Sequence, residues 1–263
     1  MGIFAKFSGK REERKAIAFV DYEHWFYSYQ NLYGLRPDPS EWRKNLETDF
    51  HITPEDIMVF ADFSKPGINS EIEKLRAVTN TIIETQQAFN RHKKDMTDFI
   101  MLDFIYQTAA QRKDINTYIL FTGDGHFQSV VKYLIQRLKK EVIVFGVKDA
   151  VSNRLKDVAS EYHEIPYPSE MKDAYYRMIV SNMDYVFDKP EIIPTFMSTV
   201  QAVSERNRIP ESNIYSALNE MIDEGLIYKR EQTVNFNRVK VIAADWDALK
   251  KAGYWDPEKK QER

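Results

Sequence analysis

The chain has 263 residues, 43% of them hydrophobic and 13% aromatic, which is enough for packed cores in one large or two smaller domains and excludes a chain that is disordered throughout. It holds no cysteine, which excludes disulfide bonds, cysteine-ligated zinc and thiol catalysis and favours a reducing compartment. The net charge of −3 means that any affinity for nucleic acid has to come from local patches. The chain contains no run of about twenty apolar residues, so no membrane span is predicted. The apolar stretch at the start is too short and is interrupted by polar residues, so it does not predict a signal peptide. We therefore expect a soluble, cytoplasmic protein.

Short apolar runs alternate with helical patterns through the first part of the chain. The runs at 16–20, 57–61, 81–85, 117–122 and 142–146 predict strands, and helical patterns cover 23–33, 42–50, 69–78, 95–111, 127–139 and 152–160. This alternation predicts an α/β domain over residues 16–165, with a parallel sheet covered by helices on both faces. Right-handed crossovers place the carboxyl ends of all strands at one edge, where such sheets bind ligands.

A proline-marked segment at 165–169 predicts a boundary to a second domain over residues 171–255. Helical patterns follow at 173–187, 195–205 and 211–224. In the last of these, an apolar stripe precedes Gly225, a residue typical of helix ends. Two strand-like runs, 226–230 and 239–243, then predict a hairpin. Three helices and a hairpin are the pattern of a small α+β winged-helix module.

Three aspartates stand where a parallel sheet builds its site. Asp21 and Asp124 follow apolar strands, and Asp98 lies in the first turn of the helix after the third strand. Carboxylates that meet in a cleft repel one another unless one keeps its proton or a cation neutralises them. Oxygen ligands suit Mg²⁺ or Mn²⁺, which can lower the pKa of a bound water for attack on a phosphodiester. Singly, each aspartate could instead be a helix cap, a turn residue or a charge that matches a helix dipole.

Three segments carry a resemblance to a known family. They are Phe19-Val-Asp-Tyr-Glu-His-Trp25, Lys94-Asp-Met-Thr-Asp98 and Phe121-Thr-Gly-Asp-Gly-His-Phe127. These segments resemble the three signatures of NYN domains, a branch of the PIN-like nucleases, and the spacing and strand order are similar over roughly residues 16 to 165. The resemblance implies a three-layer parallel-sheet fold and metal-dependent cleavage of RNA.

Carried over residue by residue, the resemblance implies that Asp21, Asp98 and Asp124 are catalytic and bind the metal, with Glu23 as a further candidate ligand. The sequence departs from the family pattern at two places. His24 stands where asparagine is usual, and His126 stands where a second aspartate is usual. His126 either supplies a neutral nitrogen ligand, better suited to Mn²⁺ than to Mg²⁺, or begins a helix without a ligand role.

Basic residues flank the expected edge of the sheet. Candidates for binding phosphates are Arg91, Lys93 and Lys94 before the Asp98 helix, and Lys148 and Arg154 after the fifth strand. Each could equally be part of an ordinary charged loop.

In the second domain, the helix at 211–224 carries acidic residues and no lysine or arginine, which is unfavourable for contact with phosphates. The basic residues lie elsewhere, at Arg206, Arg208, Lys229, Arg230, Arg238 and Lys240. Binding of nucleic acid through the wing and a protein–protein role, including a homodimer, both stay open.

These observations predict a metal-dependent ribonuclease that cleaves endonucleolytically by means of a metal-activated water. The alternative is a non-catalytic regulator that binds nucleic acid or a protein partner, with the altered third signature marking lost catalysis. DNA also stays open as a substrate, because recognition of the 2′-hydroxyl depends on the shape of the pocket.

Overall fold

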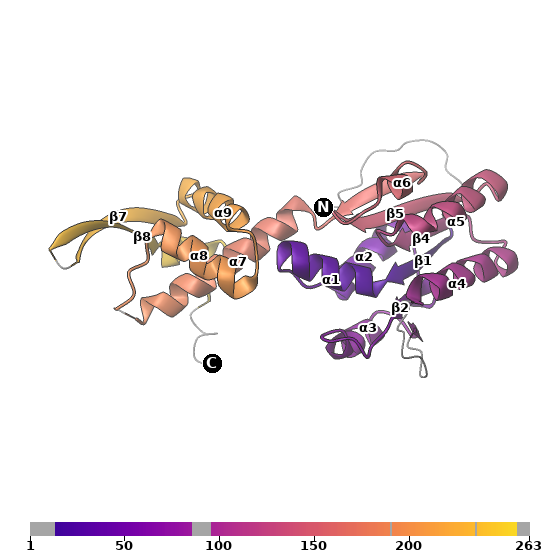
Figure 1. Cartoon of the computed structure of the whole chain (residues 1–263), viewed down its shortest axis with the longest axis horizontal. Helices are drawn as coiled ribbons and strands as arrows, with labels where there is room; N and C mark the ends of the chain where they lie inside the picture. The colour runs from indigo at the N-terminus through magenta and orange to yellow at the C-terminus, as the bar shows by residue number, and fades with distance from the viewer. Residues whose placement is uncertain (1–13, 86–95, 190, 235, 257–263) are drawn as a thin grey trace. The chain divides into compact units, whose positions relative to one another are not determined.

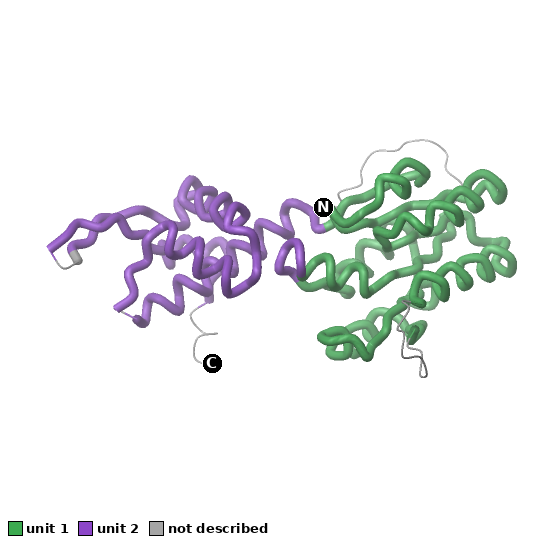
Figure 2. The backbone as a smooth tube through the Cα atoms, in the orientation of Figure 1, with its two compact units in different colours: residues 1–30, 36–165 green, residues 31–35, 166–263 purple. Residues whose placement is uncertain are grey.

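The computed structural model describes residues 14–85, 96–189, 191–234 and 236–256. The chain divides into two compact units, residues 1–30 with 36–165 and residues 31–35 with 166–263 (Figure 2). Within the described ranges, no helix is long and apolar enough to cross a membrane.

The described part of the first unit forms a six-stranded, entirely parallel sheet (Figure 1). Its strands are β1 (Ala16–Asp21), β2 (Ile57–Ala61), β3 (Thr81–Glu84), β4 (Thr117–Phe121), β5 (Glu141–Val147) and β6 (Glu161–Ile165), in the order β3-β2-β1-β4-β5-β6. The predicted parallel sheet is confirmed. Strands β1 and β4 are buried along their whole length, which is why their sequences are apolar runs.

Strand β6 was not among the predicted strands. It lies at the edge of the sheet, paired only with β5, and its first three residues are half-buried while Glu164 is exposed. An edge strand needs no continuous apolar run because much of it faces water. The region expected to be helical from 152 to 160 is helical only in α6 (Asn153–Lys156).

Helices cover the two faces of the sheet because alternate residues of each strand point in opposite directions. On β4, Tyr118 and Leu120 pack in a core with residues of α4 (Thr97–Gln111) and α5 (Gln128–Lys132). Phe121 points the other way, with its ring centroid 4.4 Å from Trp25 of α1 (Tyr22–Tyr33) and 5.0 Å from Trp42 of α2 (Pro39–Phe50). The three predicted layers are thus present, with α4 and α5 on one side of the sheet and α1 and α2 on the other (Figure 1).

Shorter elements complete the first unit. They are η1 (Pro54–Asp56), η2 (Asn69–Glu71), α3 (Ile72–Arg76), η3 (Gly125–Phe127) and the π-helical turn η4 (Tyr133–Arg137). The single helix expected at 127–139 is therefore three consecutive pieces, and the one expected at 69–78 is two. A local apolar pattern does not distinguish these tighter and wider turns from an α-helix.

The second unit contains α7 (Pro168–Phe187), α8 (Phe196–Asn207), α9 (Glu211–Asp223), β7 (Ile227–Val234), β8 (Asn237–Ala244) and α10 (Trp246–Lys251). Helix α9 buries Ile214, Leu218 and Met221 in the core of this unit. It ends at Gly225, whose φ is 73°, and the Leu226 N–H donates to the Met221 carbonyl at 2.9 Å. The predicted three helices, glycine end and hairpin are confirmed, and the assignment as a winged helix stays a prediction.

Candidate metal centre

The candidate site lies where the strand order of the sheet reverses. From β1 the chain adds β2 and β3 on one side, and β4, β5 and β6 extend the sheet on the other side. Val20 of β1 pairs with Phe121 of β4, so Asp21 and Thr122 leave the sheet beside each other. In open α/β sheets, the carboxyl ends of strands at such a reversal form the usual ligand-binding crevice.

Asp21 is buried and held by two hydrogen bonds. Its carboxylate accepts from the backbone N–H of His24 at 3.0 Å and from Oγ1 of Thr122 at 3.4 Å. The first bond caps the N-terminus of α1, so the helix-cap interpretation of Asp21 holds alongside its position at the edge. Oγ1 of Thr122 in turn accepts from the backbone N–H of Asp124 at 3.3 Å. One hydroxyl therefore links the two aspartates across the strand reversal, a role that sequence reasoning did not assign to Thr122.

The Gly-Asp-Gly turn after β4 is shaped by close packing. A Cβ on Gly123 would lie 2.2 Å from the carbonyl oxygen of Ala150 and 2.3 Å from the imidazole of His24, so no larger residue fits. The backbone of Ser152 donates to the Gly123 carbonyl at 2.9 Å. Asp124, between the two glycines, caps η3 by accepting from the backbone N–H of His126 at 2.8 Å. The turn thus presents Asp124 in one fixed orientation.

His24, which stands at the family's usual asparagine position, packs beneath this turn. Its Nε2 is buried and has no hydrogen-bond partner among the described residues. Burial lowers the pKa of His24 to about 4, against the opposing negative charge of Asp124. His24 is therefore a neutral packing residue at pH 7. The sequence carries no signal for this, because the contact with Gly123 arises only in the fold.

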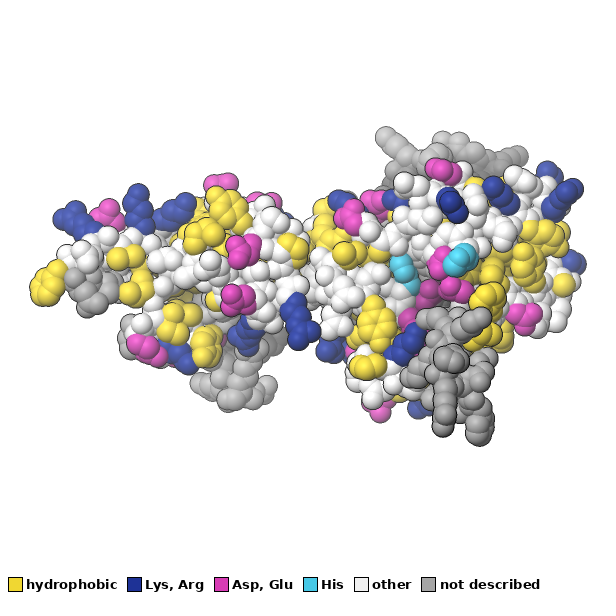
Figure 3. Space-filling view, in the orientation of Figure 1, with side chains coloured by type: hydrophobic (Ala, Val, Ile, Leu, Met, Phe, Trp, Pro, Cys, Tyr) yellow, Lys and Arg dark blue, Asp and Glu magenta, His cyan; other side chains and the backbone are white. Residues whose placement is uncertain are grey.

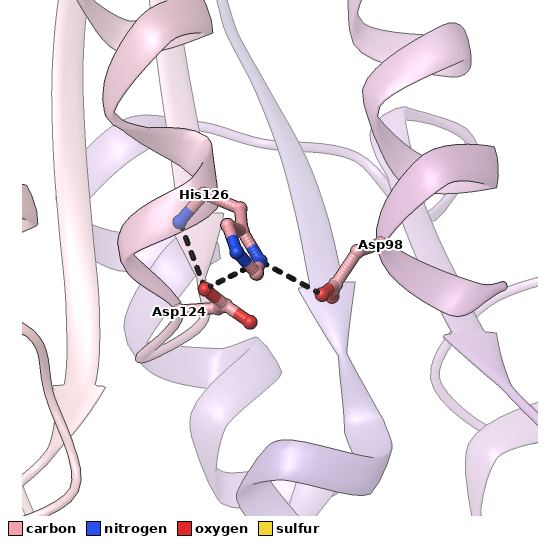
Figure 4. A group of neighbouring side chains, drawn as sticks. All are labelled: Asp98, Asp124 and His126. Atoms are coloured by element: carbon pink, nitrogen blue, oxygen red, sulfur yellow. Dashed lines mark hydrogen bonds and ion pairs between the residues drawn. The ribbon is translucent and has the colours of Figure 1, made fainter. Parts of the chain in front are cut away.

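Asp98, Asp124 and His126 come together at the surface in front of the strand reversal (Figure 4). One ligand atom from each lies within 4.8 Å of the other two. Nδ1 of His126 is 3.1 Å from Oδ1 of Asp124 and 3.9 Å from Oδ2 of Asp98. The side chain of His126 is 80% exposed, while those of Asp98 and Asp124 are 25% and 36% exposed. Two of the three predicted metal-binding aspartates are therefore neighbours, and His126, which stands where a second aspartate of its segment is usual, lies between them.

A family model described as the NYN domain matches residues 15–169. The chain belongs to the NYN domain family. This family is a branch of the PIN-like nucleases and acts on nucleic acids. Among solved structures, a protein of unknown function from Vibrio parahaemolyticus is similar with a TM-score of 0.50 and 22% sequence identity, over 60% of this chain and 97% of that one. That likeness supports the fold alone. No curated protein matches the chain.

The donor set of this NYN domain fits a divalent cation. Two ligands bound to one ion at about 2.1 Å are separated by no more than about 4.2 Å. Both Nδ1–oxygen separations, 3.1 and 3.9 Å, lie below that limit, and the carboxylates of Asp98 and Asp124 offer oxygens within 4.8 Å of each other. Figure 4 shows the second carboxylate oxygen of Asp124 pointing away from the imidazole.

Glu23 lies outside this group, and its carboxylate contacts three other residues. It accepts from the backbone N–H of Asp62 at 2.6 Å and from Oγ1 of Thr97 at 3.0 Å, and it forms an ion pair with Lys65. Thr97 directly precedes Asp98, so these contacts anchor the start of α4 to α1. Glu23 therefore positions the helix that carries Asp98. Direct ligation by Glu23 or by Asp21, which also lies outside the group, stays a prediction.

Two of the five predicted phosphate-binding residues lie within the described ranges. Lys148 directly follows β5 and Arg154 lies on α6, and both are exposed. Helix α6 packs against η3, the turn that carries His126. Figure 3 shows basic side chains on the same face of the first unit as its acidic and histidine side chains. Arg91, Lys93 and Lys94 lie outside the described residues.

Proposed function

We propose that this NYN domain is a metal-dependent ribonuclease that hydrolyses phosphodiester bonds within an RNA strand. The observation that carries the proposal is the convergence of Asp98, Asp124 and His126 at the strand reversal of the sheet. Asp98 and Asp124 supply the negative charge that attracts a divalent cation, and His126 adds a nitrogen ligand. A cation bound there lowers the pKa of a bound water and neutralises charge on the scissile phosphate.

The exposure of the site supports endonucleolytic cleavage. His126 is largely exposed, so a strand can pass across the three residues without threading an end into a closed pocket. The exposed side chains of Lys148 and Arg154 are the candidates for binding phosphates of the strand. Phe99, which directly follows Asp98, is 63% exposed and offers a surface on which a base can stack.

The contact between His126 and Asp124 also supports a second candidate function. The imidazole of His126, 3.1 Å from Asp124 and 3.9 Å from Asp98, occupies the space between the two carboxylates and could take the place of a metal as their shared contact. The domain would then bind nucleic acid or a protein partner as a regulator and would not cleave. The two candidates differ in whether a divalent ion binds at these residues.

A cleavage assay on labelled single-stranded RNA and DNA, with Mn²⁺, Mg²⁺ or EDTA, tests the proposal. We expect the wild type to cleave RNA with Mn²⁺, and we expect Asp98→Asn and Asp124→Asn to reduce the rate at least about 100-fold while the melting temperature in EDTA is kept. Asp103→Asn is the matched control, because this exposed aspartate lies on the same helix and accepts a hydrogen bond from Gln107. It should keep wild-type activity.

Replacement of His126 separates the two candidates. His126→Asp restores an all-oxygen donor set, so we expect the ratio of activity in Mg²⁺ to activity in Mn²⁺ to rise. His126→Ala removes a ligand and should weaken Mn²⁺ binding, measured by calorimetry. Absence of both cleavage and Mn²⁺ binding in the wild type, with cation binding gained in His126→Asp, would establish the regulator. Cleavage of DNA and not of RNA would show that the substrate is DNA, and the proposed metal-dependent hydrolysis of a phosphodiester would still hold.

A further inference from the structure

The hairpin of the second unit and its neighbouring helix carry opposite charges. Strands β7 and β8 hold four basic side chains and one acidic one: Lys229, Arg230, Arg238, Lys240 and Glu231. Helix α9 holds Glu211, Glu220 and Asp223 and no basic residue. Because the whole chain has a net charge of −3, a local excess of positive charge on the hairpin stands out. An anionic partner of this unit would be drawn to the hairpin and repelled by the ends of α9.

The strand register places three of these cations on one face. Glu231 pairs with Lys240, Thr233 pairs with Arg238, and Lys229 lies two residues before Glu231. Paired residues in an antiparallel hairpin share a face, and so do residues two apart, whereas Arg230 points to the opposite face. All three cations are exposed, and Figure 3 shows basic side chains in a row along the hairpin. Glu231 shares this face, with its carboxylate 3.8 Å from Arg238, so the four side chains together carry a net charge of +2. We call Lys229, Lys240 and Arg238 the basic strip.

Aromatic side chains continue the basic strip at its base. Nζ of Lys229 lies 5.3 Å from the ring centroid of Phe196, whose ring is 5.0 Å from that of Tyr215 on α9. Tyr215 is 47% exposed, and its exposed neighbours Ser212 and Ser216 are neutral and polar. Glu211 lies one helical turn before Tyr215, and the other acids of α9, Glu220 and Asp223, lie near the far end of the helix, so the repulsion of phosphate beside Tyr215 comes from one carboxylate.

A second aromatic residue marks the tip of the hairpin. Phe236 is fully exposed, and its φ of 67° is a conformation that a bulky residue adopts at a cost of about 1 kcal/mol or more. A phenylalanine gains nothing from packing inside the protein at such a position. Its flat ring could instead stack on a base.

We propose that this surface binds a single-stranded nucleic acid, with the basic strip on the phosphates and with Tyr215 and Phe236 on the bases. Phosphate contacts provide affinity without sequence information, and stacking on aromatic rings selects single strands, whose bases are accessible. The proposal concerns binding only and does not depend on cleavage at the metal centre. An acidic protein segment would also bind the three cations, but it has no bases to stack on Tyr215 and Phe236.

The test measures binding of the full-length protein in EDTA, which prevents metal-dependent cleavage. Fluorescein-labelled single-stranded RNA and DNA, the corresponding duplexes and polyglutamate are titrated at several salt concentrations. We expect single strands to bind most tightly, and we expect the basic strip to contribute about −2 to the slope of log K against log salt, or about −0.7 for each of three phosphates neutralised. The variant Lys240→Gln/Arg238→Gln should weaken binding at least about tenfold and reduce that slope by about 1.4.

Two further variants test the geometry. Arg230→Gln removes a cation from the opposite face of the same hairpin and should leave affinity unchanged. Phe236→Ser removes the exposed ring and should weaken binding of RNA while leaving any binding of polyglutamate unaffected. Circular dichroism melts establish that each variant is folded. Equal losses in Arg230→Gln and in the basic-strip variant, or binding of polyglutamate as tight as that of RNA, would overturn the proposal. Loss of cleavage with binding intact would affect only the proposed nuclease.

Discussion

Burial of His24 should make the stability of the protein depend on pH in a specific window. Its pKa falls from 6.5 to about 4 on folding, so between these pH values the unfolded chain binds a proton that the folded chain does not. The stabilisation is complete above pH 6.5 and is lost progressively as pH falls toward 4. At about 1.4 kcal/mol per pKa unit, the full effect is about 3 kcal/mol, and most of it falls between pH 7.5 and 4.5.

Urea unfolding in EDTA at pH 7.5 and at pH 4.5 measures this effect. Other groups also titrate in this range, so the informative quantity is the difference between the wild type and His24→Asn, which cannot bind the proton. We expect the variant to lose about 2–3 kcal/mol less stability than the wild type on acidification. His51→Asn is the control, because His51 is exposed in a left-handed cap conformation with φ 54°, which asparagine tolerates.

Equal losses of stability in the wild type and His24→Asn between the two pH values would show that burial does not lower the pKa of His24. An equally large change of the pH dependence in His51→Asn would show the same. A lower stability of His24→Asn at pH 7.5 alone would leave the argument intact, since replacing a packed imidazole by a smaller side chain leaves space beneath the Gly123 turn.

Two further predictions concern the surroundings of the metal centre. Gly123→Ala places a Cβ within 2.4 Å of Ala150 and His24, so we expect it to destabilise the protein by about 1–3 kcal/mol and to reduce cleavage; an unchanged melting temperature and rate would contradict the close packing of this turn. Phe99→Ala removes a largely exposed ring beside Asp98, so we expect KM for RNA to rise several-fold with little change in melting temperature; an unchanged KM in steady-state kinetics would remove Phe99 from the substrate surface.

The central strands were predictable because burial on both faces requires apolar residues at every position. Strands β1 and β4 are of this kind, and their runs end at the residues that form the site. The approach of Asp98 and Asp124 followed from topology, since one begins the helix after β3 and the other follows β4. Strand β6 was not predicted because most of its residues are only partly buried, so its sequence has no apolar run. Strand propensity depends on packing against neighbours, and an edge strand has a paired strand on one side only.

The surroundings of the aspartates were not predictable in the same way. The ion pair between Glu23 and Lys65 joins residues 42 apart, and the loop that carries Lys65 has no pattern that fixes its direction. The contact of His126 with both carboxylates depends on the turn between Gly123 and Gly125, whose shape is set by packing against residues 150–152. Sequence located the site, and tertiary packing decided which side chains touch within it.

The hydroxyl of Thr122 has a consequence for synthesis of the protein. It connects Asp21 to the Asp124 turn across 101 residues, and β4, which positions it, needs β1 as its neighbour. A nascent chain that has emerged only as far as α4 therefore carries Asp21 and Asp98 but lacks the element that brings them into register. The group of Asp98, Asp124 and His126 is complete only after β4 has joined the sheet and η3 has formed behind it, so the segment made last at the strand reversal is the segment that completes the site.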